Sequence, residues 1–128
     1  MDNLLKAFLR SDHAGEVGAV YIYKGILKIA KDPELVNFSK RHLVTEESHL
    51  QKIEGVLPKK DRSKLVWLWK VAGFLLGFLP TLFGPKIVFA TIEAVEAFVE
   101  EHYEEQLKYL RAQPNPNQEL IDLSLIHI

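Results

Sequence analysis

The sequence predicts an all-α protein, a helical bundle of three long helices with one apolar insert. Glycine and proline fall almost entirely between segments in which apolar residues recur every three or four positions, and the alternation typical of strands is hard to find. The 128 residues are 48% hydrophobic, which suffices for one domain with its own core. We therefore expect a single domain over residues 1–128.

Composition excludes several functional classes. The chain carries 16 Lys and Arg against 17 Asp and Glu, so its formal charge of −1 gives no electrostatic reason to bind nucleic acid. It has no cysteine, which excludes a disulfide framework, a thiolate nucleophile, a zinc ribbon and an iron–sulfur cluster. Any metal must therefore be held by carboxylates and imidazoles. The first ten residues do not have the pattern of a secretory leader.

The first helix is predicted from about Ser11 to Lys31, after a short amphipathic lead-in at residues 3–10. Ser11 or Asp12 is the expected N-cap, and the following Asp-Pro pair ends the helix. Its buried stripe, placed at 100° per residue, is Leu9, Glu16, Val20, Tyr23, Leu27 and Ala30. We expect His13 to act locally at the helix start, and Tyr21 and Lys24 to be ordinary exposed side chains.

The second helix is predicted from Pro33, a favourable first-turn residue, to about Glu54. Its inward stripe is Leu35, Phe38, His42, Glu46, His49 and Ile53. Two histidines and a glutamate thus occupy positions where a bundle core should be apolar. For His42 two interpretations stay open, a hydrogen bond that supports a site at Glu46 or simple helix packing.

A basic connector at residues 58–64 leads into the most apolar stretch of the chain, residues 65–90. The 15 residues between Lys70 and Lys86 carry no charge, fewer than the roughly 20 needed to cross a bilayer. Lysines and two tryptophans flank this stretch, which is typical of a helix lying in the membrane interface. We therefore expect a membrane-interface insert at residues 65–85, with a buried core hairpin as the alternative.

The third long helix is predicted from about Lys86 to Ala112, before the sequence Pro-Asn-Pro-Asn at residues 114–117. Its inward stripe is Ile92, Glu96, Val99, Tyr103, Leu107 and Leu110. The remaining residues have the pattern of only the start of a further helix.

Acidic residues in all three stripes predict a metal site. A buried, unpaired carboxylate costs several kcal/mol, and the stripes contain no Lys or Arg to neutralise it. Glu46 and His49 form an E-x-x-H pair, whose spacing directs both side chains to one side of a helix. Together with Glu16 and Glu96 on separate helices, this pair matches three quarters of a carboxylate-bridged di-iron or di-manganese site.

The string Ser-Asp-His-Ala-Gly-Glu-Val-Gly-Ala at residues 11–19 resembles the first metal-ligand helix of the demethoxyubiquinone hydroxylases. These are ferritin-like, membrane-bound di-iron monooxygenases of ubiquinone biosynthesis. The resemblance extends from about residue 9 to residue 110, through residues 46–50 and 90–107. It implies a ferritin-like bundle and places the ligands of two iron ions at Glu16, Glu46, His49 and Glu96. His102 and Tyr103 match a family pair near the site, and we expect them to have a supporting or redox role rather than to ligate metal, with ordinary packing as the alternative for Tyr103.

The family's fourth core helix carries a second E-x-x-H, and the resemblance gives no counterpart for it here. His127 has Ser124 three residues before it, and residues 122–128 resemble nothing at that point of the family. We therefore expect three of four core helices and an incomplete C-terminus. On this expectation the second iron lacks two ligands, and activity of these 128 residues alone is in doubt.

The resemblance implies O₂-dependent hydroxylation of the ring of a demethoxyubiquinone-type polyprenyl quinone at a membrane surface. The expected location is the cytoplasmic face of a bacterial cell membrane, or the mitochondrial inner membrane in a eukaryote. We expect another chain to cover exposed apolar faces, either a second copy or a ubiquinone-biosynthesis complex. Two alternatives are a non-catalytic, membrane-associated helical scaffold and a ferritin-like iron-binding protein.

Overall fold

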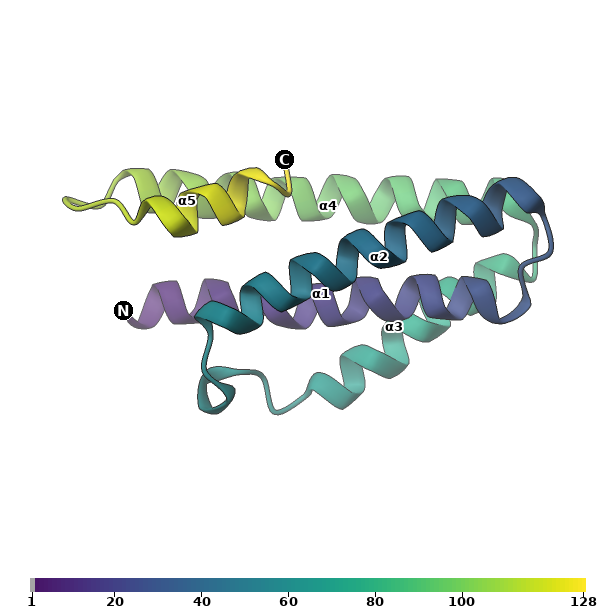
Figure 1. The fold of residues 1–128 in the computed structure, drawn as a ribbon, viewed down its shortest axis with the longest axis horizontal. Helices are drawn as coiled ribbons and strands as arrows, with labels where there is room; N and C mark the ends of the chain where they lie inside the picture. The colour runs from purple at the N-terminus through teal and green to yellow at the C-terminus, as the bar shows by residue number, and fades with distance from the viewer. Residues whose placement is uncertain (1) are drawn as a thin grey trace. The chain divides into compact units, whose positions relative to one another are not determined.

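The computed structural model describes residues 2–128, and within them the chain forms helices and no strand. The helices are α1 (Asn3–Ile29), α2 (Pro33–Val56), the 3₁₀ turn η1 (Lys59–Asp61), α3 (Val66–Thr81), α4 (Pro85–Arg111) and α5 (Gln118–Leu125) (Figure 1). The all-α prediction is therefore confirmed. The chain divides into two compact units, and the division falls within α4, between Phe89 and Ala90.

The first helix begins eight residues earlier than predicted. The side chain of Asp2 accepts a hydrogen bond of 2.7 Å from the backbone N–H of Leu5, so Asp2 is the N-cap. The prediction of Ser11 or Asp12 as the cap was wrong, because the lead-in contains no helix breaker and simply continues into α1. As predicted, the Asp32-Pro33 pair follows the end of α1, and α2 begins at Pro33. Asp32 caps the helix by accepting from the N–H of Leu35 at 3.0 Å.

In the first unit, α1 packs against both α2 and α3 and lies between them in Figure 1. The contact with α3 is made by glycines. A Cβ added to Gly73 would overlap the backbone of Gly18, and one added to Gly77 would overlap the carbonyl oxygen of Ile22. A Cβ on Gly25 would likewise overlap the backbone of Phe74. The two helices therefore approach as closely as their backbones allow.

Contact with α1 covers only one side of α3. Gly73 and Gly77 are buried, whereas most large apolar side chains of α3 and of the residues after it are exposed. The exposed ones are Trp67, Leu68, Trp69, Val71, Leu75, Leu76, Leu79, Leu82 and Phe83. Among the described helices, none has the length and apolarity needed to span a bilayer.

The second unit consists of most of α4 followed by α5, the short helix that the sequence predicts as only a beginning. Asn117 caps α5 by accepting from the N–H of Leu120 at 3.2 Å. Between the two helices, the amide of Gln106 donates to the hydroxyl of Ser124 at 3.0 Å, and both side chains are fully buried. These contacts attach α5 to the C-terminal half of α4.

Candidate metal centre

Helix α1 carries two buried carboxylates one turn apart. The exposed fractions of Asp12 and Glu16 are 2% and 4%. Residues four apart on a helix lie on the same face, so both acids share the side of α1 that carries Val20 and Tyr23. Carboxylates are almost never buried to this degree unless they are paired, protonated or bound to a cation.

Helix α2 supplies the groups that Glu16 contacts. The Nδ1 atom of His49 lies 3.8 Å from the Oε2 atom of Glu46, and their side chains are 15% and 13% exposed. Glu16 and Glu46 share a side-chain hydrogen bond. A ligand atom of Glu16 also lies within 4.8 Å of one from His49. Three of the four predicted ligands therefore come together in the first unit.

The electrostatics of this cluster favour the binding of positive charge. Burial, first of all, raises the pKa of Glu16 to about 10. This value also includes the hydrogen bond and negative charge of Glu46 and the charge of Asp12, which act in the same direction as burial, whereas His49 opposes the shift. Glu16 is therefore protonated at neutral pH, which accounts for a hydrogen bond between two carboxyl groups. A divalent ion could take the place of this proton, because carboxylate oxygens with one imidazole nitrogen suit iron or manganese.

The fourth predicted ligand, Glu96, lies on α4 in the second unit, and its side chain is exposed. The prediction that Glu96 faces inward was therefore wrong. Within the second unit, α5 is too short to cover the whole apolar stripe of α4. Three buried residues of this stripe, Tyr103, Leu107 and Leu110, lie in the half where α5 is attached, and Ile92 is buried near the start of α4. The proposed ligand role of Glu96 stays a prediction.

His102 and Tyr103, the predicted supporting pair, are in ring contact on α4. Their ring centroids lie 5.3 Å apart in an edge-to-face arrangement. The Tyr103 side chain is 2% exposed, and the ring of His127 stacks on it at 4.0 Å. The Nδ1 atom of His127 lies 2.8 Å from the carbonyl oxygen of Leu123, which can only accept, so Nδ1 carries the proton. In the second unit, packing by His127 thus fixes the position of the Tyr103 ring.

His42 packs against aromatic rings. Its ring lies 4.1 Å from that of Phe38 and 5.6 Å from that of Tyr23. Burial lowers the pKa of His42, Glu46 acts in the opposite direction, and Arg41 lowers it again. Of the two interpretations that the sequence left open, helix packing is the one with observed contacts.

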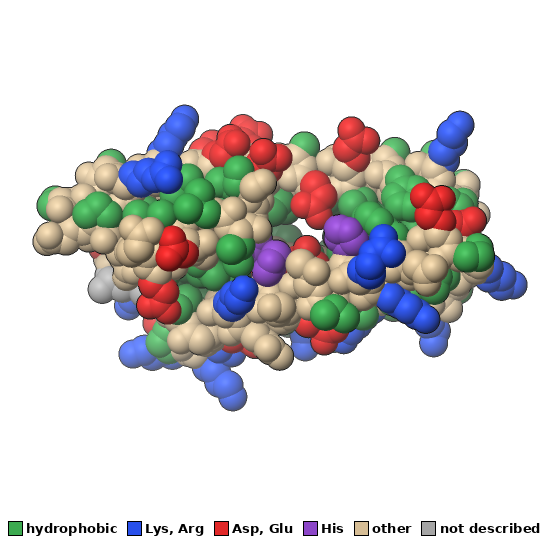
Figure 2. Space-filling view, turned by 45° about the horizontal axis from the view of Figure 1, so that its top comes forward, with side chains coloured by type: hydrophobic (Ala, Val, Ile, Leu, Met, Phe, Trp, Pro, Cys, Tyr) green, Lys and Arg blue, Asp and Glu red, His purple; other side chains and the backbone are tan. Residues whose placement is uncertain are grey.

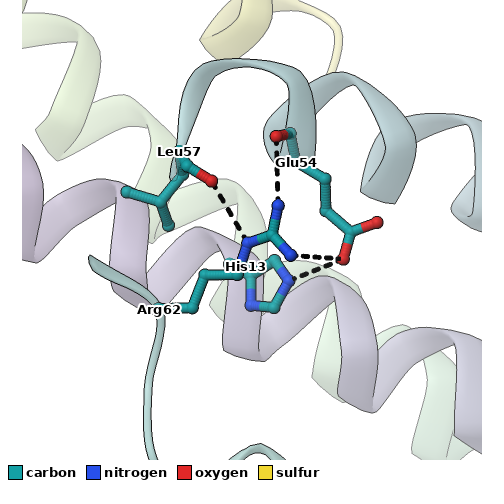
Figure 3. Close-up of polar contacts among 4 residues, drawn as sticks. All are labelled: His13, Glu54, Leu57 and Arg62. Carbon is teal, nitrogen blue, oxygen red and sulfur yellow. Dashed lines mark hydrogen bonds and ion pairs between the residues drawn. The ribbon is translucent and has the colours of Figure 1, made fainter. Parts of the chain in front are cut away.

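His13 is part of a tether between α1, the end of α2 and the connector (Figure 3). Its Nε2 atom lies 3.0 Å from the Oε2 atom of Glu54, which also lies 3.5 Å from the guanidinium of Arg62. Arg62 donates to the carbonyl oxygens of Glu54 and Leu57 at 3.1 Å, where α2 ends. Since α1 begins at Asn3, His13 lies in mid-helix, and the expectation that it acts locally at a helix start was wrong.

Sequence reasoning missed Asp12 as a member of the acidic cluster. The signal was present, because Asp12 lies one turn from Glu16 on the same face. The early helix start was overlooked, so Asp12 was assigned to a cap. Figure 2 shows histidine side chains at the surface of the molecule.

Comparisons with known proteins place this chain in a family. The family described as "Ubiquinone biosynthesis protein COQ7" matches residues 3–126. The chain belongs to this family. The match is longer than the predicted resemblance at both ends and runs into the tail that the motifs had placed outside the family. Membership also confirms the predicted class, an all-α, ferritin-like helical bundle.

Relatives of the chain carry related names. A 3-demethoxyubiquinol 3-hydroxylase of Rhodospirillum rubrum is 37% identical over 122 residues, which cover 93% of this chain and 58% of that protein. A mitochondrial NADPH-dependent 3-demethoxyubiquinone 3-hydroxylase of Caenorhabditis elegans is 32% identical, covering 94% and 66%. The enzyme of the same name in Dictyostelium discoideum is 31% identical, covering 84% and 50%. The chain thus spans about half to two thirds of the length of these relatives.

Proposed function

We propose that this chain is part of an O₂-dependent di-iron monooxygenase that hydroxylates the ring of a demethoxyubiquinone-type polyprenyl quinone. The observation that carries the proposal is the buried cluster of Glu16, Glu46 and His49, in a chain whose relatives are named as demethoxyubiquinone and demethoxyubiquinol hydroxylases. A scaffold without chemistry would have no use for carboxylates at these positions, since apolar side chains of similar volume would be more stable there.

Glu16, Glu46 and His49, with Glu96 from α4, are the proposed protein ligands of iron. When bound, iron supplies the redox chemistry that makes O₂ reactive toward the quinone ring. Glu16 gives up its proton when the metal binds. His42, one turn before Glu46 on α2, packs against the rings of Phe38 and Tyr23, and these rings are proposed to limit the access of water to this end of the cluster. His102 and Tyr103 are proposed to support the site from α4 without ligating iron.

The substrate indicates where the enzyme works. A polyprenyl quinone is too insoluble to be taken from water, and the exposed apolar side of α3 provides a surface that can enter a bilayer interface. We therefore propose peripheral attachment to a membrane through residues 65–85. The eukaryotic relatives are named as mitochondrial proteins, so the mitochondrial inner membrane is the proposed location in a eukaryote and the cytoplasmic face of the cell membrane in a bacterium.

A matched pair of variants tests the metal centre. Glu46→Ala removes a proposed ligand, whereas Glu47→Ala removes the neighbouring acid, whose side chain is exposed on the same helix. After anaerobic loading with ferrous iron, bound iron per chain should fall by about tenfold or more in Glu46→Ala and stay unchanged in Glu47→Ala. Equal iron content in both variants and the unmodified chain would contradict the proposal. Hydroxylation of a short-tailed demethoxyubiquinone, with O₂ and a reductant, then tests the activity.

Vesicle flotation tests membrane attachment independently of iron. The only two tryptophans of the chain, Trp67 and Trp69, lie in α3, so their fluorescence reports directly on this helix. The hydroxylase proposal predicts flotation with vesicles and a blue shift of the emission. A ferritin-like iron-storage protein would bind iron without floating.

A further inference from the structure

The α1–α3 side of the first unit carries a cluster of charge that the proposed function does not use. Lys24 of α1 places its Nζ atom 4.7 Å from the centre of the Tyr21 ring. Lys70 of α3 places its Nζ atom 5.8 Å from the centre of the same ring. Two ammonium groups from different helices are thus held at one aromatic ring. Neither lysine has an acidic partner among the ion pairs of the structure.

The sequence around this cluster is free of acidic residues. No Asp or Glu occurs between Glu16 and Asp32, or between Asp61 and Glu93. These two segments contain all of α3 and the C-terminal half of α1, and they carry seven basic residues: Lys24, Lys28, Lys31, Arg62, Lys64, Lys70 and Lys86. The positive potential at Tyr21 is therefore not cancelled by nearby carboxylates in these segments, and a ligand of opposite charge is favoured there.

The packing of α3 fixes the height of this cluster above the apolar surface. Glycine contacts hold α3 directly against α1, and a Cβ added to Gly18 of α1 would lie 3.6 Å from the Trp69 ring. Lys70 follows Trp69 and lies on the side of α3 near α1, since it is three residues before Gly73. Packed helices lie about 8–10 Å apart, and an interfacial helix sinks about 5–10 Å below the headgroups. With the exposed apolar side of α3 in a bilayer, Lys24 and Lys70 reach the level of the lipid phosphates.

From this geometry we infer that Tyr21, Lys24 and Lys70 form a binding site for the headgroup phosphate of an anionic phospholipid. The inference rests on the proposed membrane attachment and adds a preference for negatively charged lipid. The Tyr21 ring holds both ammonium groups at one place on the α1–α3 side, and its cation–π contacts reduce their freedom of movement. An anionic headgroup then meets two oriented charges rather than two flexible lysines.

Vesicle binding measured by tryptophan emission tests this site on the full chain. Vesicles of phosphatidylcholine alone are compared with vesicles that also contain phosphatidylglycerol. A lysine near an anionic membrane contributes about fivefold in affinity, so Lys24→Gln with Lys70→Gln should weaken binding to anionic vesicles by about 25-fold. Binding to neutral vesicles should change little. High salt should remove the preference for anionic vesicles, because exposed charges are screened.

Lys40→Gln with Lys52→Gln provides the matched control. Both lysines are exposed on α2, and their replacement changes the net charge by the same amount. Binding to anionic vesicles should then fall much less than in the first double variant. Tyr21→Phe, which keeps the ring, should bind as the unmodified chain does, whereas Tyr21→Ala should lose part of the preference.

Each other outcome overturns the inference in a recognisable way. Equal losses in the two double variants would mean that net charge alone attracts the chain. Equal binding to neutral and anionic vesicles would overturn the headgroup site and leave membrane attachment intact. Displacement of the chain by millimolar inorganic phosphate would mean that the site takes free phosphate instead of lipid. Absence of binding to any vesicle would overturn both the site and the membrane attachment, while iron loading would still test the metal centre separately.

Discussion

Helix α1 has two faces with different chemistry, one acidic and one formed by glycines. Toward α2 it buries two carboxylates, Asp12 and Glu16, and Glu16 interacts with the carboxyl group of Glu46 and the imidazole of His49. Toward α3 it presents glycines that let two backbones touch. The first face is unfavourable without a proton or a cation, whereas the second is stable through packing alone. The comparison indicates that the α1–α2 face is built for a ligand and the α1–α3 face for a fixed helix position.

The largest expected effect is a dependence of stability on pH that arises from the acidic face. Burial raises the pKa of Glu16 to about 10 from an ordinary 4.5. The stabilisation by its bound proton is complete below the unfolded pKa and is lost as pH rises from about 4.5 toward 10. In urea denaturation of the metal-free chain, the free energy of unfolding should fall by up to about 1.4 kcal/mol per pH unit over this range.

Glu16→Gln separates this effect from other titrations. The amide keeps the size of the side chain and has no proton to lose, so its stability should vary less with pH than that of the unmodified chain. Ferrous iron should reverse the slope in the unmodified chain only, because metal binding releases the proton of Glu16. Parallel pH profiles for the two proteins would show that Glu16 is not the group responsible.

One added methyl group should disrupt the glycine contact between α1 and α3. Gly73→Ala would place a Cβ against the backbone of Gly18, where no flexible side chain can move away. We expect a loss of about 1–3 kcal/mol in the free energy of unfolding, measured by urea denaturation. Gly55→Ala is the matched control, since a Cβ there meets nothing within 4 Å and Gly55 lies in the last turn of α2. It should stabilise the chain by about 0.5–1 kcal/mol.

The tether at the end of α2 sharpens the comparison, because it joins α1 to the end of α2 and to the connector (Figure 3). Arg62→Ala removes hydrogen bonds to the carbonyl oxygens of Glu54 and Leu57 and leaves the Glu54 carboxylate without its guanidinium neighbour. We expect about 1–3 kcal/mol of destabilisation by thermal or urea unfolding. Lys60→Ala, in the same connector and exposed, should change stability by less than about 0.5 kcal/mol. Similar values for the two variants would mean that the Arg62 contacts do not persist in solution.

The two faces of α1 also differ in how well the sequence predicts them. The period of the acidic stripe placed Glu16, Glu46 and His49 together, because ligand side chains must follow the helical repeat. The α1–α3 contact was missed, since glycine has no side chain and contributes nothing to a hydrophobic pattern. Asp12 was missed because its type is equally suited to a cap, and only the position of Asp2 decides between these roles. Glu96 follows the stripe of α4, but how far α5 covers that stripe depends on the length of α5 and not on the period.

The smallest expected effect concerns His42, which lies one turn before Glu46 and packs against the rings of Phe38 and Tyr23. Burial lowers the pKa of His42, so the folded chain binds the proton less well than the unfolded chain does. Stability should therefore fall as pH decreases through the ordinary histidine range near 6.5. His42→Phe keeps the stacking on Phe38 and Tyr23 and removes this titration, so it should lose less stability on acidification than the unmodified chain. If His42 only packs, iron affinity in His42→Phe should stay unchanged, whereas a hydrogen bond to a ligand of the metal would make that affinity drop by about tenfold or more.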